Sequence, residues 1–190
     1  MKLSAAAACL WLLCACATSR PDHFYILSAE PPTGGPTPSS RTIQATLKVS
    51  LPSLVDRAEI VLNSAPDAVT VLEHERWGAP LADLVSQTLA QDIERRRGDV
   101  LVGGVGRSGT QGAAIKMTVD IVQVWMHRGE PARIEVHWRI QGPQTGKELS
   151  GAEAFSAPLG HEGYAAVAQA WSACVALLAD RLAGQIPHAQ

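Results

Sequence analysis

The feature that most constrains the fold is a change of hydrophobic period within residues 42–93. Over residues 43–51, apolar and mostly polar residues alternate, which is typical of a β-strand with one buried face. Further along, apolar residues recur at three- and four-residue spacing behind Pro80, which suits a first helical position, so we expect a long helix over 79–96. Two shorter strands are expected between these elements, over 58–63 and 68–77.

The second half of the chain again combines strands with a helix. Residues 99–104 are a further strand candidate. Alternating apolar residues predict a long antiparallel hairpin with arms over 113–126 and 132–140. An Ala-rich amphipathic stretch predicts a second long helix over 161–183. Because such elements pack in layers, we expect an α/β (α+β) sandwich, in which two long helices lie on a mixed β-sheet of about five to six strands.

The first residues resemble a bacterial lipoprotein signal. Lys2 precedes an uncharged apolar stretch, which fits a secretory signal and is shorter than the ~20 apolar residues that span a bilayer. The sequence Leu13-Cys14-Ala15-Cys16 then fits the lipobox, whose last position is the lipidated cysteine. We therefore expect residues 1–15 to be a lipoprotein signal peptide and Cys16 to carry the lipid. The alternative is a soluble secreted protein that is cleaved near Ala15 or Ala17.

A lipid at this position holds the folded domain close to a membrane. Residues 16–23 form the anchor and a short tether, because seven residues separate Cys16 from Phe24 and reach at most ~25 Å when fully extended. Ala17, not Asp, follows the lipid position; in a bacterium with two membranes this favours the inner leaflet of the outer membrane, facing the periplasm. A single domain over 24–186 is expected to follow, with a flexible loop at 31–40 and a tail at 187–190.

Composition restricts the functions open to the mature chain. Removing Lys2 leaves 15 basic residues against 18 acidic ones, which is a formal charge of −3 and no basic footprint for nucleic acid. Cys174 is then the one thiol besides the lipidated cysteine, so we expect no internal disulfide even in an oxidising compartment. Its Ala-rich helical setting indicates a small buried apolar residue.

Motifs for nucleotide or metal binding are weak. Gly104, Gly106 and Gly109 have the spacing of a dinucleotide fingerprint, but a strand-like stretch follows them where a helix would have to begin. No two histidines have the i, i+4 spacing of a zinc-binding helix, and the mature chain offers no cysteine pair. We therefore expect neither a metal nor another cofactor.

Catalytic constellations are equally weak. The stretch 106–109 is one residue short of a nucleophile elbow. Glu73 and Glu75 form a carboxylate pair on a strand beside Arg76, where a solvated strand face explains them. The run Arg95–Arg97 is explained as the solvated, positively charged end of a helix, with binding of lipid headgroups as the alternative. We expect that the protein is not an enzyme, with a periplasmic hydrolase as a less favoured alternative.

Three segments, in this order along the chain, resemble a known family. They are FYILSAE at 24–30, VSLPSLVDRAEIVL at 49–62 and ERWGAPLADLVSQTLAQDI at 75–93. Together they are similar to the ABC-type transport auxiliary lipoprotein family, the type of paraquat-inducible protein C (PqiC). The positions that match the family's motifs are Tyr25 and Leu27; Leu51, Pro52, Leu54, Asp56 and Arg57; and Arg76, Trp77, Pro80 and Leu81.

The resemblance implies a non-catalytic role. Members of this family accompany lipid-trafficking systems that contain an MCE-domain protein, membrane permease components and sometimes an ATPase. The chain is therefore expected to be an auxiliary or docking subunit that contacts an MCE-domain transport protein and its associated membrane components. Homo-oligomerisation is left open. The alternative is a lipoprotein that plugs an outer-membrane barrel protein or assists its assembly.

The motif residues also have a structural interpretation. Pro52 ends a strand, because proline cannot donate a hydrogen bond to the ladder. Asp56 and Arg57 are expected to form a local ion pair, or a cap that closes the turn before the next strand. Trp77 is expected to pack the start of the helix against the sheet. The alternative makes Trp77 and Leu51 anchors for a partner, since tryptophan is frequent in binding hot spots.

Overall fold

The computed structural model of the chain describes residues 20–30, 42–103, 115–142, 148–160 and 163–187. The predicted signal peptide and the lipidation site Cys16 lie outside these described residues, as do the loop 31–40 and the glycine motif at 104–109. Of the predicted tail, only its first residue is described.

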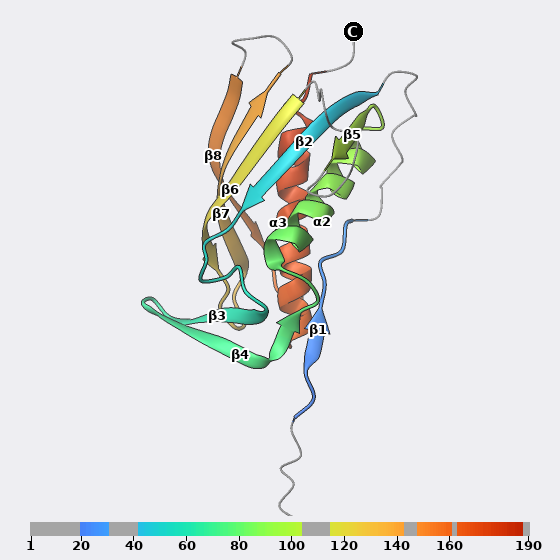
Figure 1. Ribbon diagram of the computed structural model, residues 1–190. Coiled ribbons are helices and arrows are strands. Elements are labelled where there is room, and N and C mark those ends of the chain that lie inside the picture. The colour runs from blue at the N-terminus through green and yellow to red at the C-terminus, as the bar shows by residue number, and fades with distance from the viewer. Residues whose placement is uncertain (1–19, 31–41, 104–114, 143–147, 161–162, 188–190) are drawn as a thin grey trace, which may run out of the picture.

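The larger of two sheets has five strands, in the order β5 (Val100–Gly103), β2 (Ile43–Ser50), β6 (Ile115–Trp125), β7 (Ala132–Gln141) and β8 (Glu148–Ala157). The strands β5, β2 and β6 are parallel, whereas β7 and β8 continue the sheet in antiparallel register. Both long helices, α2 (Leu81–Arg96) and α3 (Tyr164–Ala183), cover this sheet: α2 contacts β2 and β5, and α3 contacts β7 and β8 (Figure 1). The predicted sandwich of a mixed sheet and two helices is confirmed.

A second, three-stranded sheet lies at the end of the molecule where the N-terminal chain enters (Figure 1). Its central strand β4 (Ala68–Trp77) pairs in parallel with β1 (His23–Tyr25) and in antiparallel fashion with β3 (Glu59–Ala65). The two shorter predicted strands are therefore present, but they form a sheet of their own. The chain leaves the larger sheet at a turn in which the N–H groups of Val55 and Asp56 both donate to the carbonyl of Pro52 (3.0 Å each).

The predicted helices and hairpin are confirmed, with small differences at their ends. The first helix begins at Leu81 rather than 79, and the second at Tyr164 rather than 161. The strand β8 was not anticipated from the sequence. On β8, alternate positions face the helices, and these include Gly151 and Glu153, so the apolar alternation that reveals a half-buried strand is interrupted.

The reason for these two residues on β8 is Trp138 of the neighbouring strand. A Cβ atom at Gly151 would lie 2.6 Å from Cζ2 of the Trp138 ring, so only glycine leaves room for the indole. The indole N–H donates to Oε1 of Glu153 (3.1 Å), and Nε of Arg181 donates to the same oxygen (2.7 Å). The Arg181 guanidinium also lies 5.7 Å from the ring centroid. These contacts seat a tryptophan that is 4% exposed.

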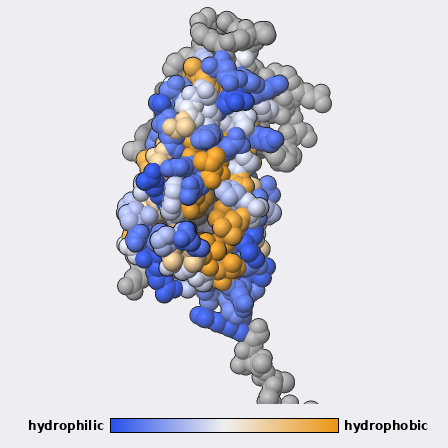
Figure 2. Space-filling model, turned by 90° about the vertical axis from the view of Figure 1, so that its left-hand side faces the viewer, coloured by the Kyte–Doolittle hydropathy of each residue, from blue (hydrophilic) through white to orange (hydrophobic). Residues whose placement is uncertain are grey.

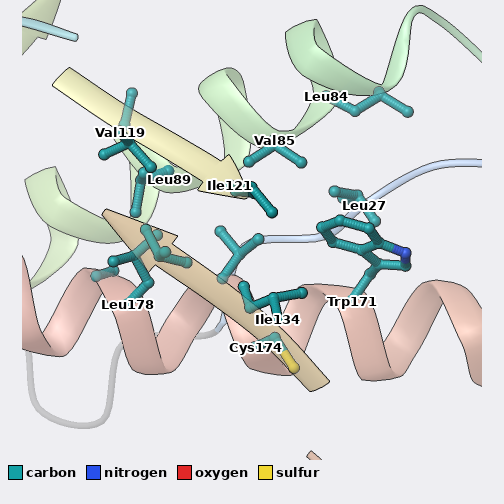
Figure 3. Close-up of a cluster of buried hydrophobic side chains, with 14 of the residues drawn as sticks. Leu27, Leu84, Val85, Leu89, Val119, Ile121, Ile134, Trp171, Cys174 and Leu178 are labelled. Atoms are coloured by element: carbon teal, nitrogen blue, oxygen red, sulfur yellow. The ribbon is translucent and has the colours of Figure 1, made fainter. Parts of the chain in front are cut away.

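The hydrophobic core lies between the larger sheet and the helices. Figure 3 shows Trp171 of α3 beside Leu27, and Cys174 beside Ile134 of β7. Each of these four side chains is at most 7% exposed. Cys174 is fully buried, and this burial raises the pKa of its thiol to about 12. The expectation that Cys174 is a small buried apolar residue is confirmed.

The helix α3 is long and apolar enough to cross a membrane, by length and composition alone, with a mean hydropathy of 1.2 over 18 residues. Within the domain, however, 61% of that window is buried, against the sheet and against α2. A helix that packs against a sheet and a second helix buries much of its surface, and it therefore needs an apolar composition. We therefore describe α3 as the central core helix of the domain.

Within the arginine run at the end of α2, Arg97 is buried, contrary to the expectation of a solvated run, whereas Arg95 and Arg96 are partly exposed. Arg97 is 8% exposed and donates to the carbonyls of Ala183 and Ile186 at the end of α3 (3.0 and 2.6 Å). It also forms a two-pronged ion pair with Asp99 (2.8 and 2.9 Å). Because the guanidinium fork satisfies several acceptors at once, Arg97 fastens the C-terminal ends of the two helices together.

We expect Gly151→Ala to lower the free energy of unfolding by about 1–3 kcal/mol, the cost of overpacking a core. This cost exceeds the gain of about 0.5–1 kcal/mol that alanine normally brings over glycine in a strand, because the Trp138 ring is held by Glu153 and Arg181 and cannot move aside. Urea unfolding followed by tryptophan fluorescence measures the change.

The matched control is Gly160→Ala, since no atom lies within 4 Å of a Cβ atom built at Gly160. This control is expected to change the free energy of unfolding by less than about 0.5 kcal/mol. If the two variants were equally stable, the packing of Trp138 on Gly151 would not be the reason for glycine at that position.

Candidate functional site

The three sequence segments that carry the family resemblance meet at one place, beside the start of α2. The strand β1 pairs with β4 so that Tyr25 lies opposite Trp77. The N–H of Gly78 donates to the carbonyl of Tyr25, and the N–H of Trp77 donates to the carbonyl of Ala58 (2.7 Å each). We call this place the motif junction; its residues are Tyr25, Leu51, Pro52, Asp56, Arg57, Arg76, Trp77 and Pro80.

Asp56 stabilises the first turn of α2 from a neighbouring loop. Pro80 stands at the N-cap position, one residue before the helix, and has no side chain that can cap it. Oδ1 of Asp56 accepts a hydrogen bond from the backbone N–H of Ala82 (3.1 Å), which is one of the free donors of a helix N-terminus. Asp56 therefore caps the long helix α2. The expectation was instead an ion pair with Arg57 or a cap on its own turn.

Arg57 and Arg76 both pair with Glu59 on β3. Nε of Arg57 lies 2.9 Å from one oxygen of that carboxylate, and a guanidinium nitrogen of Arg76 lies 3.3 Å from the other. The hydrogen bond from Arg57 is the main reason that the pKa of Glu59 lies below its ordinary value. These groups are solvent-accessible, so the pairs contribute little to stability. They do hold the exposed side of the motif junction in a fixed charge pattern.

Trp77 and Leu51 face the interior. Trp77 is 4% exposed and belongs to the core, and Leu51 is partly buried against that core. Trp77 therefore packs inside the domain, in agreement with its structural interpretation. In this conformation neither Trp77 nor Leu51 is presented to a partner. The exposed apolar side chain of this loop is Leu54, which is 50% exposed.

Glu75 is buried beneath the N-terminal strand, contrary to the expectation of a solvated face. It is 5% exposed, its Oε2 accepts a hydrogen bond from the Tyr25 hydroxyl (2.6 Å), and its Oε1 lies 3.2 Å from Nδ1 of His23. Burial acts to raise the pKa of the Glu75 carboxyl, but these two hydrogen bonds outweigh it and hold that pKa below its ordinary value. The pKa of Tyr25 rises to about 12, from burial and from the adjacent carboxylate. The sequence did contain a signal for this burial, because the period of two along a strand places Glu75 on the same face as Trp77.

The remaining chemical candidates do not assemble into a reaction centre in the described parts of the chain. Nδ1 of His74 lies 3.0 Å from a carboxylate oxygen of Asp22 on an exposed surface. Asp120 and His137 are cross-strand neighbours, and the Ser50 hydroxyl bonds to Asp120 rather than to the histidine. No group of three or more His, Cys, Asp or Glu side chains is placed to hold a metal ion within the described residues.

The strand β8 leaves a long open edge on the larger sheet. Among the described residues it has one neighbour, β7, and pairs with it over ten residues without a register shift. It contains neither lysine nor proline, the residues that usually prevent an edge strand from pairing with another chain. The opposite edge strand β5 has four residues, and its Val102 N–H is already bonded to Glu94 (2.9 Å). An open edge of this kind accepts an extended strand.

Apolar surface accompanies this edge. Figure 2 faces the side of the molecule on which β8 lies in Figure 1, and it shows an apolar band between hydrophilic side chains. Leu149 of β8 and Leu177 of α3 are each 42% exposed. The edge strand therefore combines backbone groups that point away from β7 with an exposed apolar side chain, Leu149, and these features fit a protein-binding surface.

Fold and motif junction together define a two-layer α+β domain whose motif residues build a scaffold rather than a reaction centre. A family model described as "ABC-type transport auxiliary lipoprotein component" matches residues 25–183. The chain belongs to this family, and the resemblance inferred from the three segments is confirmed. No curated protein sequence matches the chain.

Solved structures share the fold. The chain is similar to a crystal structure titled only as an uncharacterized protein, at a TM-score of 0.73 and 13% identity, covering 88% of this chain and 100% of that one. It is also similar to protein XCC0632 from Xanthomonas campestris, of the DUF330 family, at a TM-score of 0.67 and 17% identity, with 86% and 93% covered. A PelC dodecamer from Paraburkholderia phytofirmans matches at a TM-score of 0.42 and 13% identity, with 77% and 92% covered; this likeness does not bear on how the chain assembles.

We expect Tyr25→Phe to lower the free energy of unfolding at neutral pH by about 1.5 kcal/mol, since it removes a hydrogen bond to a buried charged acceptor. It should also weaken the acid dependence of stability. The low folded-state pKa of Glu75 stabilises the protein above the carboxyl's ordinary pKa, and this contribution is lost as the pH falls through the folded-state value. Without the tyrosine donor that value rises, so the variant loses less stability on acidification.

Urea unfolding at a series of pH values from about 7 to about 3 measures both effects. The control is Tyr164→Phe, which removes an exposed hydroxyl that accepts from Arg128 (2.6 Å) and should alter neither quantity appreciably. An acid dependence identical to that of the wild type would show that Tyr25 does not control the ionisation of Glu75.

Proposed function

We propose that the chain is an outer-membrane lipoprotein, anchored through Cys16 and facing the periplasm, that serves as a non-catalytic docking subunit of an MCE-type intermembrane lipid transport system. In this role it helps to maintain the integrity of the envelope. The observation that carries the proposal is the family match over residues 25–183, whose motif positions lie together at the motif junction.

The position of the N-terminal chain supports the anchoring part of the proposal. The described chain begins at Arg20 and enters the molecule at β1, in the small sheet at one end (Figure 1). With a tether of at most ~25 Å, that end stays near the membrane. A transport partner from the inner membrane therefore has to cross the periplasm to reach this subunit.

We place the partner contact at the open edge of β8. The backbone groups of β8 that point away from β7, together with the exposed Leu149, fit an extended strand with apolar side chains on the helix-facing side. The two acidic residues of this strand, Glu148 and Glu153, already pair with Arg139 (3.0 Å) and Arg181 (2.7 Å), so the fit rests on the backbone groups and Leu149 rather than on charge.

We expect Cys16→Ser to release the protein from membranes into the soluble periplasm without unfolding it, because the domain begins beyond the tether. Fractionation and metabolic labelling with a fatty acid measure this. The wild type should be labelled and sediment with outer membranes, and the variant should be unlabelled and soluble. Fatty-acid label on the Cys16→Ser protein would contradict lipidation at this residue.

We expect detergent-solubilised wild-type protein to recover an MCE-domain protein without added nucleotide or metal, and Ala154→Lys to reduce that recovery by about tenfold or more. A lysine in the middle of an open edge opposes strand addition, and Ala154 is exposed on β8. The matched control is Gln44→Lys, which adds the same charge on β2, an inner strand of the same sheet. Equal recovery with both variants would exclude β8 as the contact.

Gene deletions test the proposed function independently of the contact at β8. Deleting the gene should weaken the envelope barrier as much as deleting the MCE gene, and the double deletion should add little. Additive phenotypes, with recovery of a barrel protein in place of an MCE protein, would instead support the alternative role in assembling or plugging an outer-membrane barrel.

A further inference from the structure

Two large apolar side chains stand outside the core beside the point where the tether enters. Phe24 is 67% exposed and Ile26 is 64% exposed, more than the other exposed large apolar side chains of the described residues. Tyr25, which lies between them, donates a hydrogen bond to the buried Glu75. Leu27, which follows them, lies in the core and is 7% exposed. Alternation in an extended segment puts Phe24 and Ile26 on the same outward side.

These two side chains flank a shallow hollow against α3. Its other wall is made of small residues of the helix, among them Ala165, Ala168 and Ala173. The segment is rigidly held there: the N–H of Ser28 donates to Oγ of Ser172 (3.1 Å), and the N–H of Glu30 donates to Oδ1 of Asp92 (3.0 Å). The apolar face is therefore a fixed surface and not the loose end of a tether.

The charged groups around this face are already paired. Glu30 lies 3.3 Å from Arg96, and Glu75 is bonded to Tyr25 and His23. No unpaired carboxylate among the hollow's described lining residues opposes an anionic surface. Exposed aromatic and aliphatic side chains without repelling charge are the groups that enter the boundary between lipid headgroups and acyl chains.

We propose that Phe24 and Ile26 insert into the phospholipid surface and orient the domain on its membrane. The argument for this occupant is the length of chain outside the described structure: seven residues separate Phe24 from Cys16, so the face lies within ~25 Å of the lipidated residue. The inference rests on the proposed lipidation of Cys16. The lipid provides attachment, and the two side chains determine which end of the domain faces the membrane.

The orientation has a consequence for the rest of the domain. The small sheet and the start of α3 lie toward the membrane, whereas β5 lies at the opposite end (Figure 1). Leu101 on β5 is 50% exposed and provides a matched apolar position that should stay in water. The comparison therefore separates a specific contact from general stickiness of exposed apolar side chains.

The test places one fluorophore at each position in the lipidated full-length protein. Phe24→Cys, Ile26→Cys and Leu101→Cys are labelled with bimane and reconstituted into phosphatidylethanolamine–phosphatidylglycerol vesicles that contain a spin-labelled phospholipid. Cys174 is fully buried, with a thiol pKa raised to about 12, so it stays unlabelled in the folded protein, and the wild type serves as the blank.

We expect quenching by the spin-labelled lipid at positions 24 and 26 to exceed that at 101 at least threefold, with a blue shift of their emission. Equal quenching at the three positions, or a blue shift without lipid quenching, would overturn the proposal; the second result would identify a protein contact instead. Failure of the wild type to float with the vesicles would overturn the anchoring at Cys16 together with this inference, whereas flotation with equal quenching overturns this inference alone.

Discussion

The larger sheet has one face to remove from water, and the packing of α2 and α3 on that face determines the rest of the structure. Twelve of the twenty residues of α3 are buried, which explains why this helix is as apolar as a weak membrane span. The three parallel strands β5, β2 and β6 and the antiparallel strands β7 and β8 need a cover of about this width. Arg97 holds the two helices together at their C-terminal ends. The carbonyl of Ala183, one of its acceptors, is among the groups that the end of α3 leaves unpaired, and Ile186 lies just beyond the helix.

The N-terminal segment is hydrogen-bonded to both helices of this cover. Tyr25 and Leu27 point inward, and hydrogen bonds from Gly78, Ser28 and Glu30 fix the backbone on both sides of them. The tether therefore ends in a rigid strand.

Much of the fold was predictable because hydrophobic period is a local signal. The alternation in β6 and β7 and the spacing in α2 and α3 were sufficient to place these elements within a few residues. The strand β8 was not predicted because Gly151 and Glu153 accommodate Trp138 on another strand. The burial of Glu75 and Arg97 was not predicted because Tyr25, and the carbonyls of Ala183 and Ile186, lie 50 or more residues away from them. From the sequence alone a charged residue is predicted to be solvated, because the distant groups that bind it in the fold are not apparent. The motif residues were found through the family resemblance, but their convergence on one helix start, with Asp56 as its cap, needed the three-dimensional structure.

The positions that identify the family therefore differ from the surfaces available for binding. Trp77, Asp56 and Tyr25 are engaged in core packing, helix capping and the burial of Glu75, so they specify a scaffold. The exposed features are the open edge of β8 and the face formed by Phe24 and Ile26, and neither depends on the motif side chains for its chemistry. Because these features lie on different elements of one rigid domain, contact at one leaves the other free. The two proposed contacts, with a lipid surface and with a partner strand, are therefore compatible, as the proposed docking role requires.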